Sequence, residues 1–183
     1  MRADAQRNAD ALTDAARTVF AEQGVDAPAK VIADRAGVGV GTLYRRFPQR
    51  SDLVVAVFRQ AVEDCATAAE ELRAEHEPDE ALARWLQRFT GFVATKRGLA
   101  AALQSGDPAF EGLHPYFIGR LGGALTGLLD DAAAAGTVRA DLDAEQLLRA
   151  AADLSHGAPT VEQSQFLVGL LVDGLRWRAT SPA

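Results

Sequence analysis

Apolar side chains recur along this chain three and four residues apart, the spacing that places them on one face of an α-helix. The pattern divides into nine segments, and glycine or proline stands at the breaks between them, as is typical of helix ends. The chain is therefore predicted to be all-α, with about nine helices. The predicted helices span about Asn8–Gln23, Pro28–Ala36, Val40 or Gly41 to Phe47, Ser51 into the low seventies, Asp79–Arg97, Leu99–Ser105, Phe110 or His114 to Ala135, Asp143–His156 and Thr160–Ala179.

Two of these helices are short and are joined by a tight turn that contains glycine. Gly37 follows the first of them, where a left-handed backbone conformation closes a helix, and Val38 is the apolar residue expected beneath such a turn. In the second helix Leu43 and Phe47 are four residues apart and are expected to face inward. The other side chains of that helix, which carry hydroxyl, phenol and guanidinium groups, then face solvent or a partner. This pattern predicts a helix-turn-helix.

The same residues resemble a known family. The run FAEQGVDAPAKVIADRAGVGVGTLYRRFPQRSDLVVAVF, residues 20–58, is similar to the DNA-binding domain of the TetR family of bacterial transcription regulators. The similarity is densest over AGVGVGTLYRRFPQRSDL, and with RADAQRN ahead of it the chain resembles a group common in actinobacteria. The rest of the chain resembles the family only in its size, its helicity and the late segments LLRAAADL and LLVDGLR.

The resemblance implies that the second short helix lies in the major groove of DNA. Val40, Gly41 and Thr42 are then expected at the base edges, and Gly41 permits close approach. Thr42 offers its hydroxyl to a base or its methyl group to thymine, and the alternative is that it only caps the helix. Tyr44 is expected to contact the DNA backbone, unless it packs as an ordinary amphipathic aromatic residue.

Basic side chains on and beside this helix are expected to add contacts. Arg46 stands where many family members have histidine and is expected at the backbone, but whether Arg45 or Arg46 contacts a base stays open. Lys30 would hold a phosphate together with the partial positive charge of a helix amino terminus. Arg50 replaces a frequent lysine and is expected to keep a phosphate contact, with solvated surface charge as the alternative. The predicted DNA-binding residues are Lys30, Val40, Gly41, Thr42, Tyr44, Arg45, Arg46 and Arg50.

The net charge of −6 is unevenly distributed along the chain. Residues 1–50 carry eight Lys and Arg against six Asp and Glu, whereas the remainder carries eleven against nineteen. A basic end on an acidic body favours docking on phosphate through one face. A chance distribution of surface residues would explain this uneven charge equally well.

Composition indicates a soluble, helical chain. Its 183 residues, 48% of them hydrophobic, suffice for a sizeable core and two subdomains. No apolar run approaches the ~20 residues of a membrane span, and the polar amino terminus is unlike a signal peptide. Cys65 is the single cysteine, so no intrachain disulfide can form and a reducing cytoplasm is the expected compartment. We expect Cys65 to be a small buried residue without a redox role.

The resemblance implies two domains. Residues 1–50 are expected to form a three-helix DNA-binding domain, and residues 51–183 a helical domain for effector binding and dimerisation. The helix that begins near Ser51 would connect them, and in the family this helix transmits ligand binding to the DNA-binding domain.

The family places its effector cavity among the helices that follow this connection. Aromatic residues there are candidate pocket walls, although an aromatic stripe at helical spacing is more often core packing. A mainly apolar pocket would suit an apolar or aromatic effector. The four glycines between residues 119 and 127 favour either close helix packing or space for a ligand. The candidate pocket residues are Trp85, Phe89, Phe92, Phe110, His114 and Phe117.

The last two predicted helices carry more apolar surface than one small bundle needs. In the family these helices form a four-helix interface between two subunits, and the resemblance implies a twofold homodimer here. The alternative is an internal core pair. The candidate interface residues are Leu147, Leu154, Phe166, Leu167, Leu170, Leu171 and Trp177.

Taken together, these features predict a ligand-responsive transcription regulator, of which a repressor on a palindromic operator is the preferred form. An enzyme is disfavoured because the chain has no HExxH, GxSxG or glycine-rich phosphate loop, and no cofactor is predicted. His114 and His156 are too isolated for a metal site. The alternative function is a helical small-molecule or partner-binding module that does not bind an operator.

Overall fold

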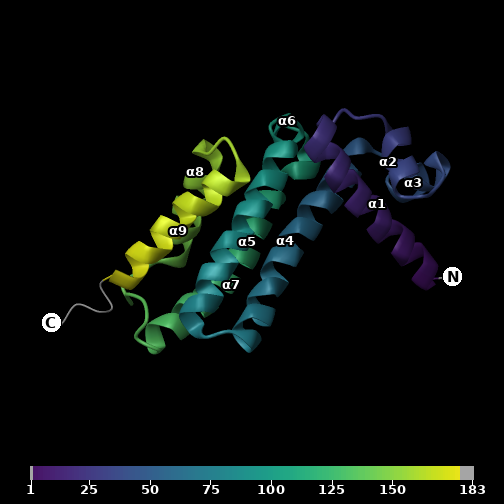
Figure 1. The fold of residues 1–183 in the computed structure, drawn as a ribbon. Coiled ribbons are helices and arrows are strands. Elements are labelled where there is room, and N and C mark those ends of the chain that lie inside the picture. Colours follow the sequence, from purple (N-terminus) through teal and green to yellow (C-terminus); the bar gives the residue numbers. More distant parts are fainter. Residues whose placement is uncertain (1, 178–183) are drawn as a thin grey trace. The chain divides into compact units, whose positions relative to one another are not determined.

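The structure is a computed structural model that describes the backbone of residues 2–177 and the side chains of residues 7–176. Over that range it contains nine α-helices, one short 3-10 helix and no strand, which confirms the predicted all-α class (Figure 1). The elements are α1 Arg2–Gln23, α2 Ala29–Arg35, α3 Val40–Arg46, α4 Arg50–Glu75, α5 Pro78–Gly98, α6 Ala100–Leu103, η1 Pro108–Phe110, α7 Leu113–Ala134, α8 Ala144–Gly157 and α9 Val161–Trp177.

Most helix starts lie within about one residue of the prediction. Helix α1 is the exception, because it begins at Arg2 and not near Asn8. Helix α4 begins at Arg50 instead of Ser51, and the backbone N–H of Gln49 donates to Oδ2 of Asp52 at 2.9 Å. A carboxylate that reaches back over the first turn satisfies one of the unpaired N–H groups there, so α4 does not depend on a hydroxyl cap.

The described residues divide into two compact units, and the boundaries between them fall inside α4, α5 and α7. The first unit combines the chain up to Ala61 with Thr95–His114, and the second combines Val62–Ala94 with the chain from Pro115 onward. In the first unit the apolar faces of α1 to α4 form a core in which Phe20 and Ile32 are fully buried.

Gly98 brings two backbones together inside the first unit. A Cβ atom added to this last residue of α5 would lie 3.3 Å from the carbonyl oxygen of Phe20 and 3.4 Å from Cα of Ala21. Both neighbouring atoms belong to the backbone of α1, which cannot move aside as a flexible side chain does. A side chain at this position would need the backbone of α1 to shift slightly, so glycine suits this contact for a geometric reason.

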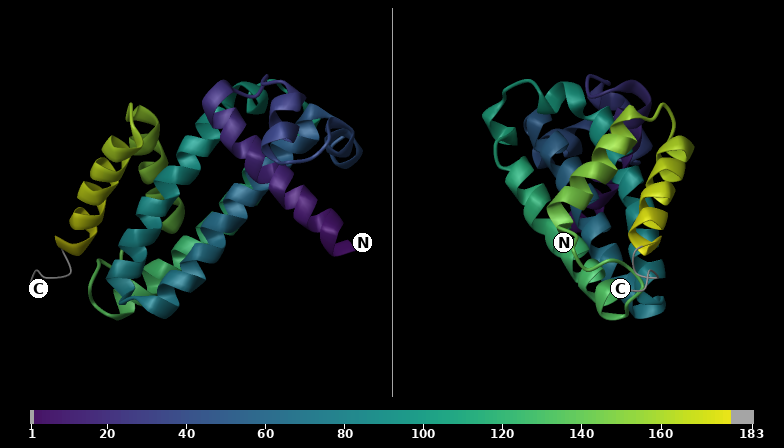
Figure 2. Two further views of the ribbon diagram at one scale, coloured as in Figure 1. Left: turned by 45° about the vertical axis from the view of Figure 1, so that its right-hand side comes forward. Right: turned by 90° about the vertical axis from the view of Figure 1, so that its left-hand side faces the viewer.

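The second unit is a helical bundle in which α8 and α9 pack side by side (Figure 2). Trp85 is fully buried, and its indole N–H donates to the carbonyl oxygen of Cys65 at 2.8 Å, so its one polar group is satisfied. Cys65 is itself buried, and burial raises the pKa of its thiol to about 12, which agrees with the predicted structural role. No helix between residues 2 and 177 combines the length and apolarity that crossing a membrane would need.

Candidate nucleic-acid interface

The turn between α2 and α3 has the geometry predicted from its glycine. Gly37 has φ of +68°, in the left-handed region, and its N–H donates to the carbonyl of Asp34 at 3.2 Å. The N–H of Val38 donates to the carbonyl of Ala33 at 3.0 Å. This pair of bonds closes α2 and allows the chain to turn into α3 within a few residues. Figure 1 shows α2 and α3 as adjacent short helices.

Helix α3 is fixed by one apolar face and presents the other to solvent. Leu43 and Phe47 are 3% and 4% exposed, as their four-residue spacing predicted. Tyr44 is 55% exposed, and both Arg45 and Arg46 are exposed as well. A large aromatic ring held in solvent beside two guanidinium groups is suited to a polyanionic partner.

Thr42 and Arg45 form a pair on this exposed surface. Nη2 of Arg45 donates to Oγ1 of Thr42 at 3.0 Å. The residue at the cap position of α3 is Gly39, and no side chain caps the helix. The alternative that Thr42 merely caps α3 is therefore wrong, and its hydroxyl instead accepts a hydrogen bond on the exposed surface.

Two further basic residues of the helix-turn-helix are paired with carboxylates. Nζ of Lys30 lies 2.6 Å from Oδ2 of Asp34, and Nη1 of Arg35 lies 2.9 Å from Oε2 of Glu22. All four side chains are largely exposed, so both pairs are accessible to salt and to competing anions. To contact a phosphate, the Lys30 ammonium group would have to share its charge between the phosphate and Asp34. The predicted phosphate contact of Lys30 stays a prediction.

Arg50 lies in a different setting from the one expected. Its Nε donates to the carbonyl of Val25 at 2.6 Å, and Nη2 contacts the carbonyls of Val25 and Ala27, while Cζ lies 5.2 Å from the centre of the Phe20 ring. Partial burial lowers the pKa of its guanidinium from the usual value. Arg50 thus ties the start of α4 to the loop between α1 and α2. The alternative of a solvated surface charge does not match this arrangement, and the phosphate contact stays a prediction.

Comparisons with known proteins agree with this geometry. A family model described as bacterial regulatory proteins of the tetR family matches residues 12–57, and one described as the SbtR-like transcriptional regulator C-terminal domain matches residues 77–177. A TetR transcriptional regulator from Streptomyces coelicolor is 37% identical, with a TM-score of 0.81 over 92% of this chain and 98% of that one. The TetR transcription regulatory protein from Mycobacterium vanbaalenii is 36% identical, with a TM-score of 0.76 over 96% of this chain and 98% of that one.

The chain belongs to the TetR family of bacterial regulators. An HTH-type transcriptional regulator of Staphylococcus aureus is 28% identical over 109 residues, and this match spans only 59% of that curated relative's length. Members of the TetR family are DNA-binding transcription factors and not enzymes, so the predicted class of function is confirmed.

The aromatic residues proposed to line an effector pocket in this TetR-family chain are packed against each other. The rings of Trp85 and Phe89 stack at 5.8 Å between centroids, and Phe92 and Phe117 stack at 5.3 Å. All four are buried in the second unit, whereas Phe110 and His114 belong to the first unit and are half-buried and exposed. Trp85, Phe89, Phe92 and Phe117 therefore form one stacked cluster, whereas Phe110 and His114 are assigned to the other unit, and the effector pocket stays a prediction.

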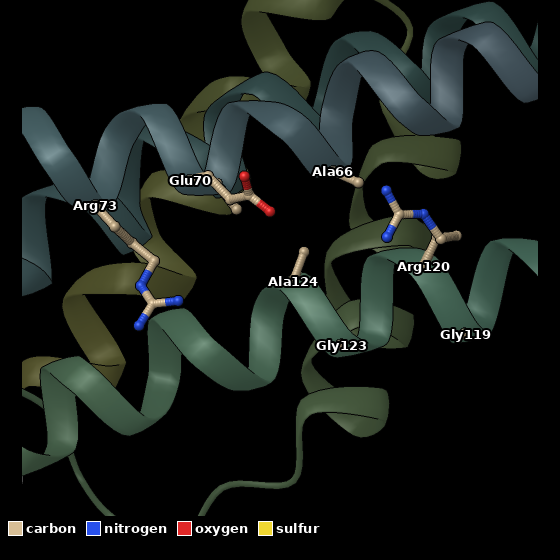
Figure 3. Close-up of a pocket in the computed structure, with 8 residues that line it drawn as sticks. Ala66, Glu70, Arg73, Gly119, Arg120, Gly123 and Ala124 are labelled. Atoms are coloured by element: carbon tan, nitrogen blue, oxygen red, sulfur yellow. The ribbon is translucent and has the colours of Figure 1, made fainter.

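Two clefts in the second unit have different linings from the one predicted. The first has a volume of about 210 Å³ and lies between α4 and α7. Figure 3 shows the guanidinium groups of Arg73 and Arg120 at its two ends and the carboxylate of Glu70 between them. Small residues from both helices, including Gly119 and Gly123, form the rest of its lining.

The second cleft, of about 320 Å³, lies between α7 and the start of α8 and includes Gly122 and Asp143. A Cβ atom on Gly119, Gly122 or Gly123 would meet no other atom within 4 Å, so these glycines do not serve close helix packing. Of the two explanations that the sequence left open, space for a ligand is the one compatible with these three positions. Gly127 differs, because a Cβ there would lie 3.0 Å from Nη1 of Arg73.

The predicted dimer residues divide into exposed and buried sets. Phe166 and Leu170, one turn apart on α9, are 65% and 54% exposed. Leu154, Leu167 and Leu171 are half-buried. Leu147 is only 5% exposed and packs within its own subunit, so it offers a partner little surface. The side chain of Trp177 lies outside the described residues.

Sequence reasoning missed a polar network that joins α4 to α7. The carboxylate of Glu63 accepts hydrogen bonds from the hydroxyl of Tyr116 and from Nε of Arg120, the latter at 2.8 Å. Hydrogen bonds from Arg120 and Tyr116 lower the pKa of Glu63 to about 2. Because these residues are more than fifty positions apart, no local pattern in the sequence could have paired them.

Proposed function

We propose that this protein is a homodimeric repressor that binds a palindromic operator and is released by a small-molecule effector. The observation that carries the proposal is the exposed surface of α3, where Tyr44, Arg45 and Arg46 face solvent. Among the described residues, neither arginine is paired with a carboxylate. Uncompensated cationic groups on the second helix of a helix-turn-helix favour docking in the major groove.

In this proposal residues 1–50 contain the DNA-contacting surface, and residues 51–183 serve effector binding and dimerisation. Val40, Gly41 and Thr42 lie at base edges, and Tyr44 and Arg46 contact the backbone. A cytoplasmic location follows from an operator on the bacterial chromosome. Two copies of α3 about 34 to 36 Å apart would meet successive major grooves, which a twofold dimer provides.

The proposed subunit interface centres on α9. Large apolar side chains are seldom left more than half exposed without a reason, and Phe166 and Leu170 lie on one side of this helix. Half-buried Leu167 and Leu171 adjoin them. A second copy of the same surface would cover these residues symmetrically.

The effector is proposed to bind in the second unit. The buried rings of Trp85, Phe89, Phe92 and Phe117 would suit an apolar or aromatic compound, but such a ligand would have to separate stacked rings. The cleft between α4 and α7 is already open, and its walls include the helix that leads from the DNA-binding residues. A ligand in either place would bias the position of α4.

The test combines selection of bound DNA from a random pool with a measurement of molecular mass. The wild-type protein should enrich an inverted repeat and should sediment as a dimer. The double variant Phe166→Glu and Leu170→Glu should sediment as a folded monomer and should bind the selected operator at least ~100-fold more weakly, because half of the contacts are lost. Folded wild-type protein that enriches no sequence would favour the helical binding module without operator binding.

A further inference from the structure

We propose that Arg45, and not Arg46, contacts a guanine base in each operator half-site, and that Thr42 positions the Arg45 guanidinium for this contact. This inference rests on the proposed function, because it requires α3 to lie in the major groove. It names the arginine that contacts a base and the base that it contacts. The sequence alone left open whether Arg45 or Arg46 has this role.

The direction of the Arg45 side chain is the first step. Side chains of a helix point back toward its amino terminus, so a residue in the last turn covers the surface of the turn before it. Nη2 of Arg45 is 3.0 Å from Oγ1 of Thr42, and Nη1 is 3.8 Å from the place that a Cβ on Gly41 would occupy. The guanidinium therefore lies beside Gly41 and Thr42, the part of a recognition helix that approaches base edges.

The second step is the hydrogen-bonding capacity of the pair. A guanidinium carries five N–H donors and no acceptor, and Thr42 occupies one of them. The Arg45 guanidinium thus keeps its other N–H donors and offers a base no acceptor. Guanine offers two acceptors in the major groove, O6 and N7, which the fork of an arginine fits, whereas cytosine offers an N–H donor that a guanidinium cannot accept.

Arg46 lies in a different place although it is the next residue. Its Cζ is 5.0 Å from the centre of the Phe47 ring, at the carboxyl end of α3. A guanidinium stacked on an aromatic ring keeps its edges free for an anion. This position suits a phosphate oxygen and not a base edge.

The third step is electrostatic. An arginine that enters the groove loses part of its hydration, and one that already holds a carboxylate must also give up that partner. Lys30 and Arg35 have such partners in Asp34 and Glu22. Within the described part of the chain no carboxylate pairs with Arg45, so its transfer to a guanine breaks no ion pair.

The experiment compares DNA selected from a random pool by full-length wild-type protein, Arg45→Ala and Arg46→Ala. We expect a guanine at one position of each half-site for the wild type, lost from the Arg45→Ala motif at that position alone. On defined DNA the wild type should discriminate against the exchanged base pair by roughly 10- to 100-fold, and Arg45→Ala by no more than about 2-fold. Arg46→Ala should retain the motif, bind all DNA more weakly and show a shallower salt dependence.

Replacing that guanine by 7-deazaguanine removes the N7 acceptor without changing the shape of the base. Binding by the wild type should fall about 10-fold, and binding by Arg45→Ala should not change. Thr42→Val should reduce the guanine preference because the oxygen that holds Arg45 is gone, whereas Thr42→Ser should retain it. The second variant distinguishes a positioning role from a general loss of structure.

Three outcomes would overturn the inference. An unchanged guanine preference in Arg45→Ala, with weaker binding to all DNA, would make Arg45 a phosphate contact. Loss of the guanine preference in Arg46→Ala would exchange the two roles. If folded wild-type protein selects no motif, the proposed function fails together with the inference, and this result differs from a motif that simply does not depend on Arg45.

Discussion

The two arginines of α3 and two arginines of the second unit, Arg73 and Arg120, have opposite surroundings. Among the side chains of residues 7–176, Arg45 and Arg46 have no carboxylate partner, and both stand on an exposed helix face. In the second unit, Nε of Arg73 lies 2.6 Å from Oδ2 of Asp131, and Nη2 of Arg120 lies 2.5 Å from Oε2 of Glu63. Both ion pairs join α4 to α7. The same side chain is thus unpaired on the proposed recognition surface and joins two helices where it is paired.

This contrast explains how a chain with a net charge of −6 can bind a polyanion. DNA is attracted mainly by unpaired positive charges that lie close to it. Exposed charges more than about 8 Å away are screened at physiological ionic strength. An acidic second unit in which Arg73 and Arg120 are paired with carboxylates contributes little attraction of its own. Net charge is therefore a poorer guide to DNA binding than the pairing state of a few residues.

The largest effect is expected when both unpaired arginines are removed. The double variant Arg45→Ala and Arg46→Ala should bind operator at least ~100-fold more weakly at physiological salt, with a melting temperature within about 2 °C of the wild type. Fluorescence anisotropy at several salt concentrations and thermal unfolding would measure both. The matched control, Arg73→Ala with Arg120→Ala, removes the same charge from paired positions. An equal loss of DNA affinity in the control would contradict the comparison.

A smaller effect is expected at Arg50, whose partners are carbonyl groups. Arg50→Gln should lower the free energy of unfolding by about 1 to 2 kcal/mol, because the carbonyls of Val25 and Ala27 lose their donor. Operator affinity should fall about 10-fold through loss of the ordered loop, while the salt dependence of binding stays unchanged. A salt slope reduced by about one would instead show that Arg50 contacts phosphate.

The smallest effect is expected at Arg120 and should depend on pH. The pKa of Glu63 is about 2 in the folded protein against a usual value of 4.5, so the pair contributes stability above about pH 4.5 that is lost as the pH falls toward 2. Arg120→Ala should lower the melting temperature by about 2 °C at pH 7 and by less at pH 3, with DNA binding unchanged.

Arg84→Ala is the control for this variant. Arg84 pairs with Glu80 on the same exposed helix face and joins no second helix, so its loss should leave the melting temperature unchanged at either pH. An equal effect of Arg84→Ala and Arg120→Ala would mean that the network between α4 and α7 adds nothing beyond a surface ion pair.

The sequence was sufficient for the helix-turn-helix because local chemistry determines it. The spacing of Leu43 and Phe47 fixed the buried face of α3, and Gly37 fixed the turn before it. The exposure of Tyr44 followed from the same spacing. Helical geometry alone predicts contacts between residues that are within about five positions of each other, and these features are of that kind.

Features that depend on segments far apart in the chain could not be derived in this way. Arg50 bonds carbonyls more than twenty residues earlier, and the partner of Glu63 lies fifty-seven residues later. Trp85, Phe89, Phe92 and Phe117 are buried in a stacked cluster, and periodicity cannot distinguish such a core from a pocket wall. For the same reason Leu147 was grouped with Phe166, although only the latter is exposed.

The contact at Gly98 has a consequence for how this protein can evolve. If every position were varied at random and the population selected for operator binding, residue 98 should rank among the least tolerant, although glycine has no side chain to offer a base or an effector. Gly119 and Gly123, which face open space, should accept many substitutions. Intolerance to substitution at Gly98 would then reflect the short distance between two backbones and not a functional side chain. A search that relied on mutational sensitivity alone would wrongly identify Gly98 as a functional residue.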